Sequence, residues 1–137
     1  MKLTLESINN INLFENLTGA KVKDCIMENN KLVFLVEEGN IKQALGKDNS
    51  NIFRLQKLLK KDIEIIGYSD DVTKFVRNLI YPNRADDIRS ENNVVAIVIS
   101  DVNVKGRIFG RGRENLKKIN ELVKKYFNME VRVVYLF

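Results

Sequence analysis

Apolar residues recur along the chain with two spacings, and these spacings predict alternating helices and strands. A spacing of three or four residues, as in Leu5, Ile8, Ile11 and Phe14, is typical of one face of a helix. Apolar runs such as KLVFLVE (31–37) and NVVAIVIS (93–100) are typical of strands. The predicted order is helix, strand, strand, helix, turn, helix, strand, and it occurs twice along the chain. We therefore expect an α+β fold.

The two series of elements also align with each other as an internal repeat. A shift of 64 residues superposes the polar positions of a turn and the helix after it: Gly46 on Gly110, Lys47 on Arg111, and Asn51 on Asn115. The strand before the turn aligns as LVFLVE (32–37) over AIVISD (96–101). The strand after it aligns as IEI (63–65) over MEV (129–131), with an insertion of two residues. A repeat of about 65 residues predicts two domains, which we place at 1–68 and 69–137.

Punctuating residues and apolar stripes fix further element boundaries. Ser69 and Asp70 are candidate caps for the first helix of the second domain, and Pro82 marks the exit from that helix. The helix after the first turn is expected to bury one apolar stripe: Ile52, Leu55, Leu58 and Leu59. The corresponding stripe after the second turn is Leu116, Ile119, Leu122, Val123 and Tyr126.

Charge divides the chain unevenly. The whole chain has 23 Lys and Arg against 18 Asp and Glu. Residues 1–71 hold 10 basic and 11 acidic residues, whereas residues 72–137 hold 13 and 7. A basic surplus confined to one half favours a localised anionic partner for that half.

The residue types that usually carry chemistry are scarce. The chain has no histidine, the commonest general base and metal ligand, and its single cysteine, Cys25, lies in a predicted strand without a base beside it. Acidic pairs such as Asp86 and Asp87 stand where turns and helix caps are predicted. We therefore expect no enzymatic activity, no cofactor, no metal site and no small-molecule substrate.

The same composition bears on location. No run of about 18 apolar residues is present, so no membrane span or membrane partner is predicted. Acidic and amide side chains interrupt the first residues, unlike a signal peptide, and a single cysteine suits a reducing compartment. We expect a cytoplasmic protein.

The stretch RIFGRGRENL (107–116) contains the second glycine turn, between a short helix and a longer one. Glycine lets the main chain approach a phosphate without a Cβ in the way. The helix that follows presents free N–H groups and the positive end of its dipole to an anion. Read alone, the stretch is either a phosphate-binding loop or a merely basic turn.

Three segments resemble the archaeal NusA-like transcription factors, which are built of two tandem type II KH domains. The segments are LGKDNSNI (45–52), YSDDVTKFVRNLIYP (68–82) and IFGRGRENLKKINELVKKYF (108–127). The resemblance implies two KH domains, each a three-stranded mixed sheet with helices on one face. It also implies RNA binding during transcription, in termination or antitermination, with single-stranded RNA as ligand and RNA polymerase or the elongation complex as partner.

A KH loop clamps the backbone of about four single-stranded nucleotides, and this identifies the candidate RNA-binding residues. In the second domain they are Arg107, Gly110, Arg111, Gly112, Arg113, Asn115, Lys117 and Lys118, and in the first domain they are Gly46 and Lys47. The fourth loop position, ordinarily glycine in the family, is Asn49 in the first loop and Arg113 in the second. Asp48 places a carboxylate where phosphate should lie, which costs on the order of a kcal/mol. The loop at Gly46–Asn49 is therefore degenerate and expected to be the weaker site.

Two other functions fit the same residues. The chain could be a ribosome-associated or RNA-processing KH protein, because those assemblies use the same module. It could also be a KH-fold protein-interaction scaffold whose loops no longer bind RNA; Asp48 favours this interpretation in the first domain, and the basic second half opposes it.

Overall fold

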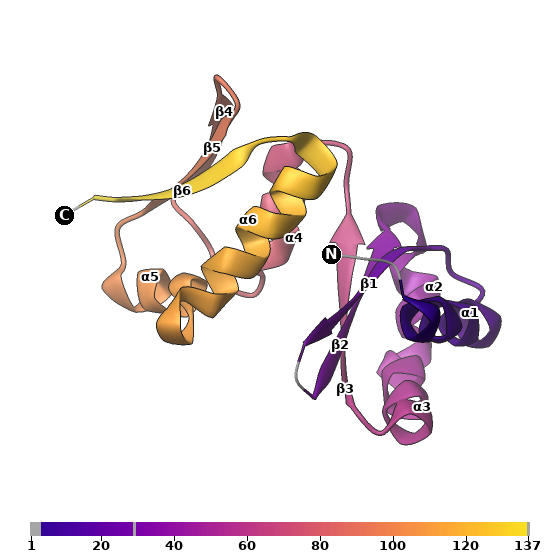
Figure 1. The fold of residues 1–137 in the computed structure, drawn as a ribbon. Coiled ribbons are helices and arrows are strands. Elements are labelled where there is room, and N and C mark those ends of the chain that lie inside the picture. Colours follow the sequence, from indigo (N-terminus) through magenta and orange to yellow (C-terminus); the bar gives the residue numbers. More distant parts are fainter. Residues whose placement is uncertain (1–3, 29, 137) are drawn as a thin grey trace. The chain divides into compact units, whose positions relative to one another are not determined.

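The computed structural model describes residues 4–28 and 30–136. The chain forms two compact units that divide between Tyr68 and Ser69. Within these residues each unit contains three α-helices, short 3-10 turns beside them and one three-stranded sheet (Figure 1). Each unit is described by itself. No helix in the described ranges is both long enough and apolar enough to cross a membrane.

The first unit begins with α1 (Leu5–Thr18), followed by strands β1 (Val22–Glu28) and β2 (Lys31–Glu37). A short helix α2 (Ile41–Leu45), the longer α3 (Ser50–Leu59) and strand β3 (Asp62–Tyr68) complete it. The sheet order is β1-β2-β3, with β1 antiparallel and β3 parallel to the central strand. Its three helices lie on one face of the sheet, as Figure 1 shows.

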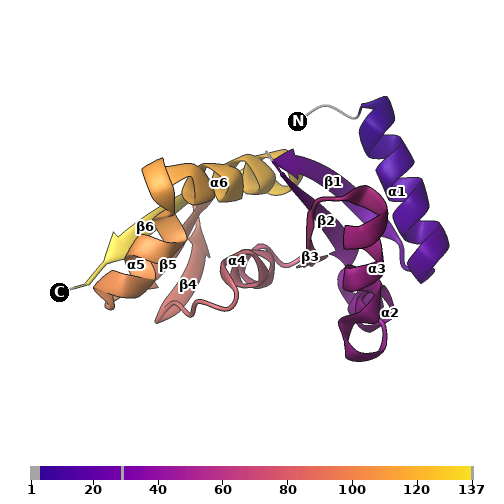
Figure 2. The ribbon, with the colours of Figure 1, turned by 90° about the horizontal axis from the view of Figure 1, so that it is seen from below.

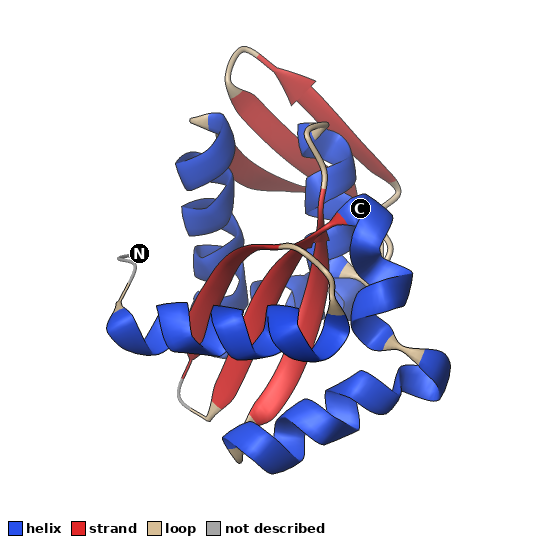
Figure 3. Ribbon diagram, turned by 90° about the vertical axis from the view of Figure 1, so that its right-hand side faces the viewer, coloured by secondary structure: helices blue, strands red, loops and turns tan. Residues whose placement is uncertain are grey.

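The second unit repeats this order with a shorter first helix and longer second and third helices. It consists of α4 (Val72–Ile80), β4 (Asp87–Glu91), β5 (Val94–Ile99), α5 (Val102–Phe109), α6 (Glu114–Phe127) and β6 (Glu130–Tyr135). The sheet order is β4-β5-β6, again with one antiparallel and one parallel pair. Figure 2 shows α5 and α6 joined by a short turn, and Figure 3 separates the two sheets from the helices by colour. The predicted α+β fold with two mixed sheets is confirmed.

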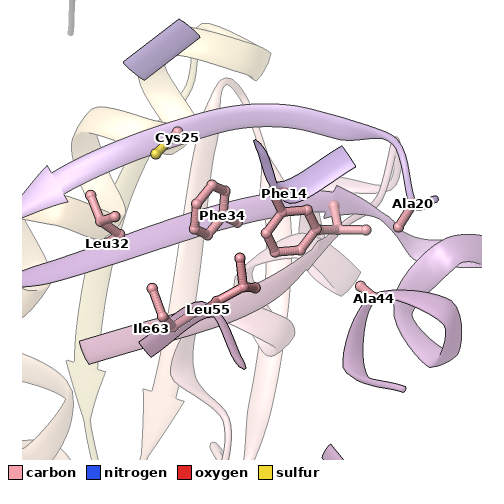
Figure 4. Close-up of a cluster of buried hydrophobic side chains, with 9 residues drawn as sticks. Phe14, Ala20, Cys25, Leu32, Phe34, Ala44, Leu55 and Ile63 are labelled. Carbon is pink, nitrogen blue, oxygen red and sulfur yellow. The ribbon is translucent and has the colours of Figure 1, made fainter. Parts of the chain in front are cut away.

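Each unit has its own hydrophobic core between sheet and helices. In the first unit the rings of Phe14 and Phe34 lie 4.4 Å apart between centroids, and Leu55 of α3 is fully buried beside them (Figure 4). In the second unit the ring centroids of Phe75 on α4 and Phe127 on α6 lie 5.7 Å apart, and Ile97 is fully buried on β5. Burying a side chain of this size stabilises a fold by about 1.5–3 kcal/mol.

The residue-by-residue alignment of the two copies is wrong in the strands, although their order is right. Leu32 lies in the core and pairs with Ile63, whereas Ala96, its partner in a 64-residue shift, pairs with the exposed Arg132. Val95 is the true counterpart, because it is buried and pairs with the buried Val131. A slip of one residue moves every side chain of a strand to the other face.

Two helix lengths explain this slip. Helix α5 has 8 residues, whereas α2 has 5. The segment from the central strand to the loop glycine is one residue longer in the second unit than in the first. Helix α6 has 14 residues against 10 in α3, so the insertion before the last strand is four residues rather than two.

Some predicted apolar faces also differ from the structure. Helix α1 turns Leu5 to solvent and buries Ser7, Asn10 and Thr18 around Phe14. Hydroxyl bonds explain how polar groups are accommodated there: the Ser7 N–H donates to Thr4 Oγ1 at 3.1 Å, and Thr18 Oγ1 donates to the Phe14 carbonyl at 2.8 Å.

Two smaller predictions are corrected in the same way. The cap of α4 is Asp71, one residue beyond the predicted pair, because its carboxylate accepts the Thr73 N–H at 3.0 Å. Leu58, predicted to lie in the buried stripe of α3, is exposed.

Candidate nucleic-acid interface

The two glycine turns have the same backbone conformation. The first loop is Gly46–Asn49, between α2 and α3, and the second loop is Gly110–Arg113, between α5 and α6. The first glycine has φ 72° and ψ 178° in one loop and φ 73° and ψ 174° in the other. The third and fourth residues are left-handed in both: Asp48 at φ 54°, Asn49 at 59°, Gly112 at 60° and Arg113 at 63°. Three non-glycine residues thus keep a costly conformation, so the surrounding structure imposes this turn.

An asparagine at the second position of the following helix secures each loop. Asn51 Nδ2 donates to the carbonyl of Gln43 at 3.2 Å, and Asn115 Nδ2 donates to the carbonyl of Ile108 at 3.0 Å. Each bond ties the start of the second helix to the end of the first. Asn115 therefore has a structural role in the loop, and its contact with RNA stays a prediction.

The leading glycine of each loop has no room for a side chain. A Cβ on Gly110 would lie 2.7 Å from Asn115 Cβ and 3.1 Å from the Asn115 backbone nitrogen. A Cβ on Gly46 would lie 2.8 Å from Asn51 Nδ2, which can move only by giving up its bond to the Gln43 carbonyl. By contrast, nothing lies within 4 Å of a Cβ built on Gly112. The first glycine is thus required by space as well as by its positive φ.

The helices that leave the two loops begin without a side-chain cap. Helices α1, α4 and α5 start with Thr4, Asp71 and Asp101, whose side chains accept backbone N–H groups of the first turn. The cap positions of α3 and α6 are Asn49 and Arg113, and neither side chain makes such a bond. Since the first turn of a helix carries unpaired N–H groups and a partial positive charge, an external anion can take the place of the cap.

The two loops have the same backbone conformation but carry different charges. Arg111 and Arg113 give the second loop two positive charges, whereas Lys47 and Asp48 cancel in the first. All four side chains are exposed and can meet a ligand. The second loop is therefore the one that combines backbone geometry, an uncapped helix and net positive charge.

The other predicted residues of the second unit lie on the helices beside the loop. Arg107 is exposed on α5, with Nη1 3.4 Å from Asn83 Oδ1. Lys117 is exposed on the first turns of α6, and Lys118 is half-buried. These side chains and the loop belong to one helix-turn-helix segment, while Gly46 and Lys47 belong to the other unit.

Comparisons with known proteins identify the module. A family model described as KH domain matches residues 10–81, from within α1 to the end of α4. A protein from Methanocaldococcus jannaschii named "Probable transcription termination protein NusA" is 32% identical, over 92% of this chain and 70% of its own length. The chain belongs to the archaeal NusA-like family of KH-domain proteins.

Other comparisons agree with this assignment. A protein of the same name from Methanococcus vannielii is 33% identical, over 86% of this chain and 70% of its own length. The crystal structure of APE1850 is 34% identical and superposes with a TM-score of 0.74, covering 98% of this chain and 100% of that one. KH domains are RNA-binding modules, so this NusA-like chain is a member of a family of RNA-binding proteins named for transcription termination.

A ring beside the second loop was missed by the sequence analysis. In this NusA-like chain the guanidinium carbon of Arg113 lies 5.5 Å from the centroid of the Phe109 ring, and Lys105 Nζ lies 5.8 Å from it. Such cation–π contacts are worth about 0.5–1 kcal/mol at exposed sites. The four-residue spacing of Lys105, Phe109 and Arg113 was the available signal. The first loop has Leu45 and Asn49 at the matching positions, so only the second holds its arginine against a ring.

Cys25 is the remaining side chain with reactive chemistry, and its surroundings suppress it. It lies in the core of the first unit of the NusA-like chain, on β1. Burial, and then the negative charge of Asp24, raise the pKa of this thiol to about 12. The thiol therefore stays protonated at neutral pH and acts as a packing group.

Proposed function

We propose that this chain is an RNA-binding transcription factor that holds single-stranded RNA with the second loop and takes part in termination or antitermination. Phosphates of the RNA contact Arg111, Arg113 and the backbone at the start of α6. Lys117 and Arg107 extend the basic surface on either side of the loop. The first loop contributes less, because Asp48 repels a phosphate at the point where Gly112 lets one approach.

The observation that carries this proposal is the combination found at Gly110–Arg113. A left-handed glycine turn leads into a helix without a side-chain cap, and two arginines flank the entrance. Phosphate binding at a helix N-terminus requires free N–H groups, and charge-assisted bonds from arginine add to them. The family supports the nature of the ligand, since KH loops bind single-stranded nucleic acid.

Charge reversal in the loop tests RNA binding without disturbing the core. The double variant Arg111→Glu with Arg113→Glu changes two exposed side chains and leaves Gly110 in place. We expect it to weaken binding of a single-stranded RNA oligonucleotide by about a hundredfold or more, because two charged contacts become repulsive. Fluorescence anisotropy measures the affinity, and circular dichroism reports whether the fold is intact.

A matched control makes the same change of charge elsewhere in the second unit. Arg89 and Arg132 are exposed, and each follows a buried strand residue, Ile88 or Val131, so it lies on the opposite face of the sheet. The double variant Arg89→Glu with Arg132→Glu should therefore keep its affinity within about threefold if loop position and not total charge decides binding. Equal losses in the two double variants would contradict the loop assignment.

The transcriptional part of the proposal has a separate test. The family name points to termination, so we infer that the chain associates with RNA polymerase or the elongation complex. Affinity purification of the tagged chain from its own cells should enrich polymerase subunits over ribosomal proteins after nuclease treatment. Enrichment of ribosomes instead would assign the chain to the ribosome-associated class of KH proteins.

A further inference from the structure

Helix α3 of the first unit exposes two large apolar side chains beside two cations. Phe53 is 60% exposed and Leu58 is 57% exposed, and Arg54 and Lys57 are exposed between them. Residues that are three or four positions apart are neighbours on a helix surface. The four side chains, which we call the α3 patch, therefore form one continuous face of the helix.

The charge of the α3 patch is of one sign. Helix α3 contains no acidic residue, and neither Arg54 nor Lys57 forms an ion pair within the described ranges of the chain. Phe53 and Leu58 lie at the two edges of this face and the cations lie between them. A partner that covers both apolar side chains must therefore bring negative charge to the middle of the patch.

The matching positions of the second unit show that the patch is not part of the common architecture. Lys117, Lys118, Glu121 and Leu122 occupy them on α6. Leu122 is fully buried there, and α4 packs against the same helix. Lysine thus stands where the first unit has Phe53, and a packed leucine stands where it has Leu58.

We propose that the α3 patch docks an acidic amphipathic helix of another protein, with apolar side chains over Phe53 and Leu58 and carboxylates beside Arg54 and Lys57. Leu58 offers nothing on which a base could stack, and Asp48 in the loop before α3 disfavours phosphate, so protein suits the patch better than RNA. Aromatic and arginine side chains are also the common anchors of protein interfaces. The inference is independent of RNA binding by the second loop.

The size of the patch limits the strength of the contact. Four side chains fall well below the roughly 1,200 Å² buried by stable interfaces. We therefore expect a transient complex that forms and dissociates readily, with a dissociation constant on the order of 10–100 μM.

The experiment titrates the isotope-labelled full chain with two synthetic helical peptides and a single-stranded RNA. One peptide carries glutamates between two rows of leucines, and the other is identical except that lysines replace the glutamates. The acidic peptide should shift the amide signals of α3 and bind at least about tenfold more tightly than the basic one. The variant Arg54→Glu with Lys57→Glu should reverse this preference.

Two further variants distinguish specific docking at the α3 patch from nonspecific hydrophobic binding. Phe53→Ser with Leu58→Ser should lower the affinity for the acidic peptide by about tenfold. Leu5→Ser, which removes an exposed leucine from α1, should leave this affinity unchanged. RNA should shift the second loop and not α3. The proposal is overturned if both peptides bind equally, if the charge reversal has no effect, or if RNA rather than peptide occupies the α3 patch.

Discussion

The two loops of this chain share one backbone conformation but differ in the side chains that they expose. Both turns place a glycine at φ near 72°, two left-handed residues after it and an asparagine that ties the helices together. The side chains on this frame then differ: arginines flank the second loop, whereas the first carries a lysine and an aspartate that cancel. The comparison teaches that in a KH module the turn geometry can persist while the net positive charge of the loop is lost.

The helices after the loops differ in the same sense. Helix α6 begins with a glutamate and carries lysines at its fourth and fifth residues, beside a loop that holds Arg113 against Phe109. Helix α3 instead exposes Phe53 and Leu58. We interpret this as a division of labour, in which the second unit binds nucleic acid and the first presents an apolar, basic face to a protein.

The largest effect is expected from the glycines, which test whether the two turns are equally constrained. Alanine at either position must adopt a glycine-only conformation, at a cost of about 1–3 kcal/mol. Gly110→Ala should lie at the upper end of this range, because a backbone nitrogen at 3.1 Å cannot move away. Gly46→Ala should lie at the lower end, because only side-chain atoms of Asn51 and Ser50 must move, at the cost of the Asn51 bond to the Gln43 carbonyl.

Urea denaturation of each alanine variant measures this difference in the free energy of unfolding. Alanine at Gly112, where the space is open, serves as a control for strain from positive φ alone. If Gly46→Ala were the more damaging change, the view that the second turn is the more tightly built would be wrong.

A smaller effect is expected from transferring the charge of the second loop to the first. The changes Lys47→Arg, Asp48→Gly and Asn49→Arg reproduce the second loop on a backbone that already has its torsion angles. In the Arg111→Glu, Arg113→Glu background, this graft should recover about tenfold in RNA affinity, which corresponds to about one charge-assisted contact. Recovery measured by anisotropy would show that side-chain charge distinguishes the loops; no recovery would mean that α6 or its surroundings decide binding.

The sequence was sufficient for the order of elements and for both turns, because these depend on local signals. Apolar runs locate the strands, and Gly46 and Gly110 end the short helices that precede the loops. The KH fold follows from that order.

The register of the repeat could not be predicted, because it depends on helix length. Neither the extra turn of α6 nor the additional residue before Gly110 changes the spacing of the apolar residues. These insertions nevertheless decide that Val95, and not Ala96, faces the core. Which residues of α1 and α3 are buried could not be predicted either. Whether Leu5 or Leu58 is covered depends on what packs against the helix, which the spacing of apolar residues does not encode.

At the candidate site, sequence found the arginines but not what positions them. The contact between Arg113 and Phe109 and the bond from Asn115 to the Ile108 carbonyl require that two helices meet at a defined angle. Such contacts follow from tertiary packing and therefore become visible only in the structure.

The salt dependence of RNA binding tests most directly whether the second loop, and not the first, neutralises phosphate. For single strands the slope of log K against log salt concentration changes by about 0.7 for each phosphate contact. Arg111→Ala with Arg113→Ala should therefore reduce the magnitude of the slope by about 1.4, while Lys47→Ala leaves it unchanged. An unchanged slope in the arginine variant, or a reduction of about 0.7 in Lys47→Ala, would contradict the account.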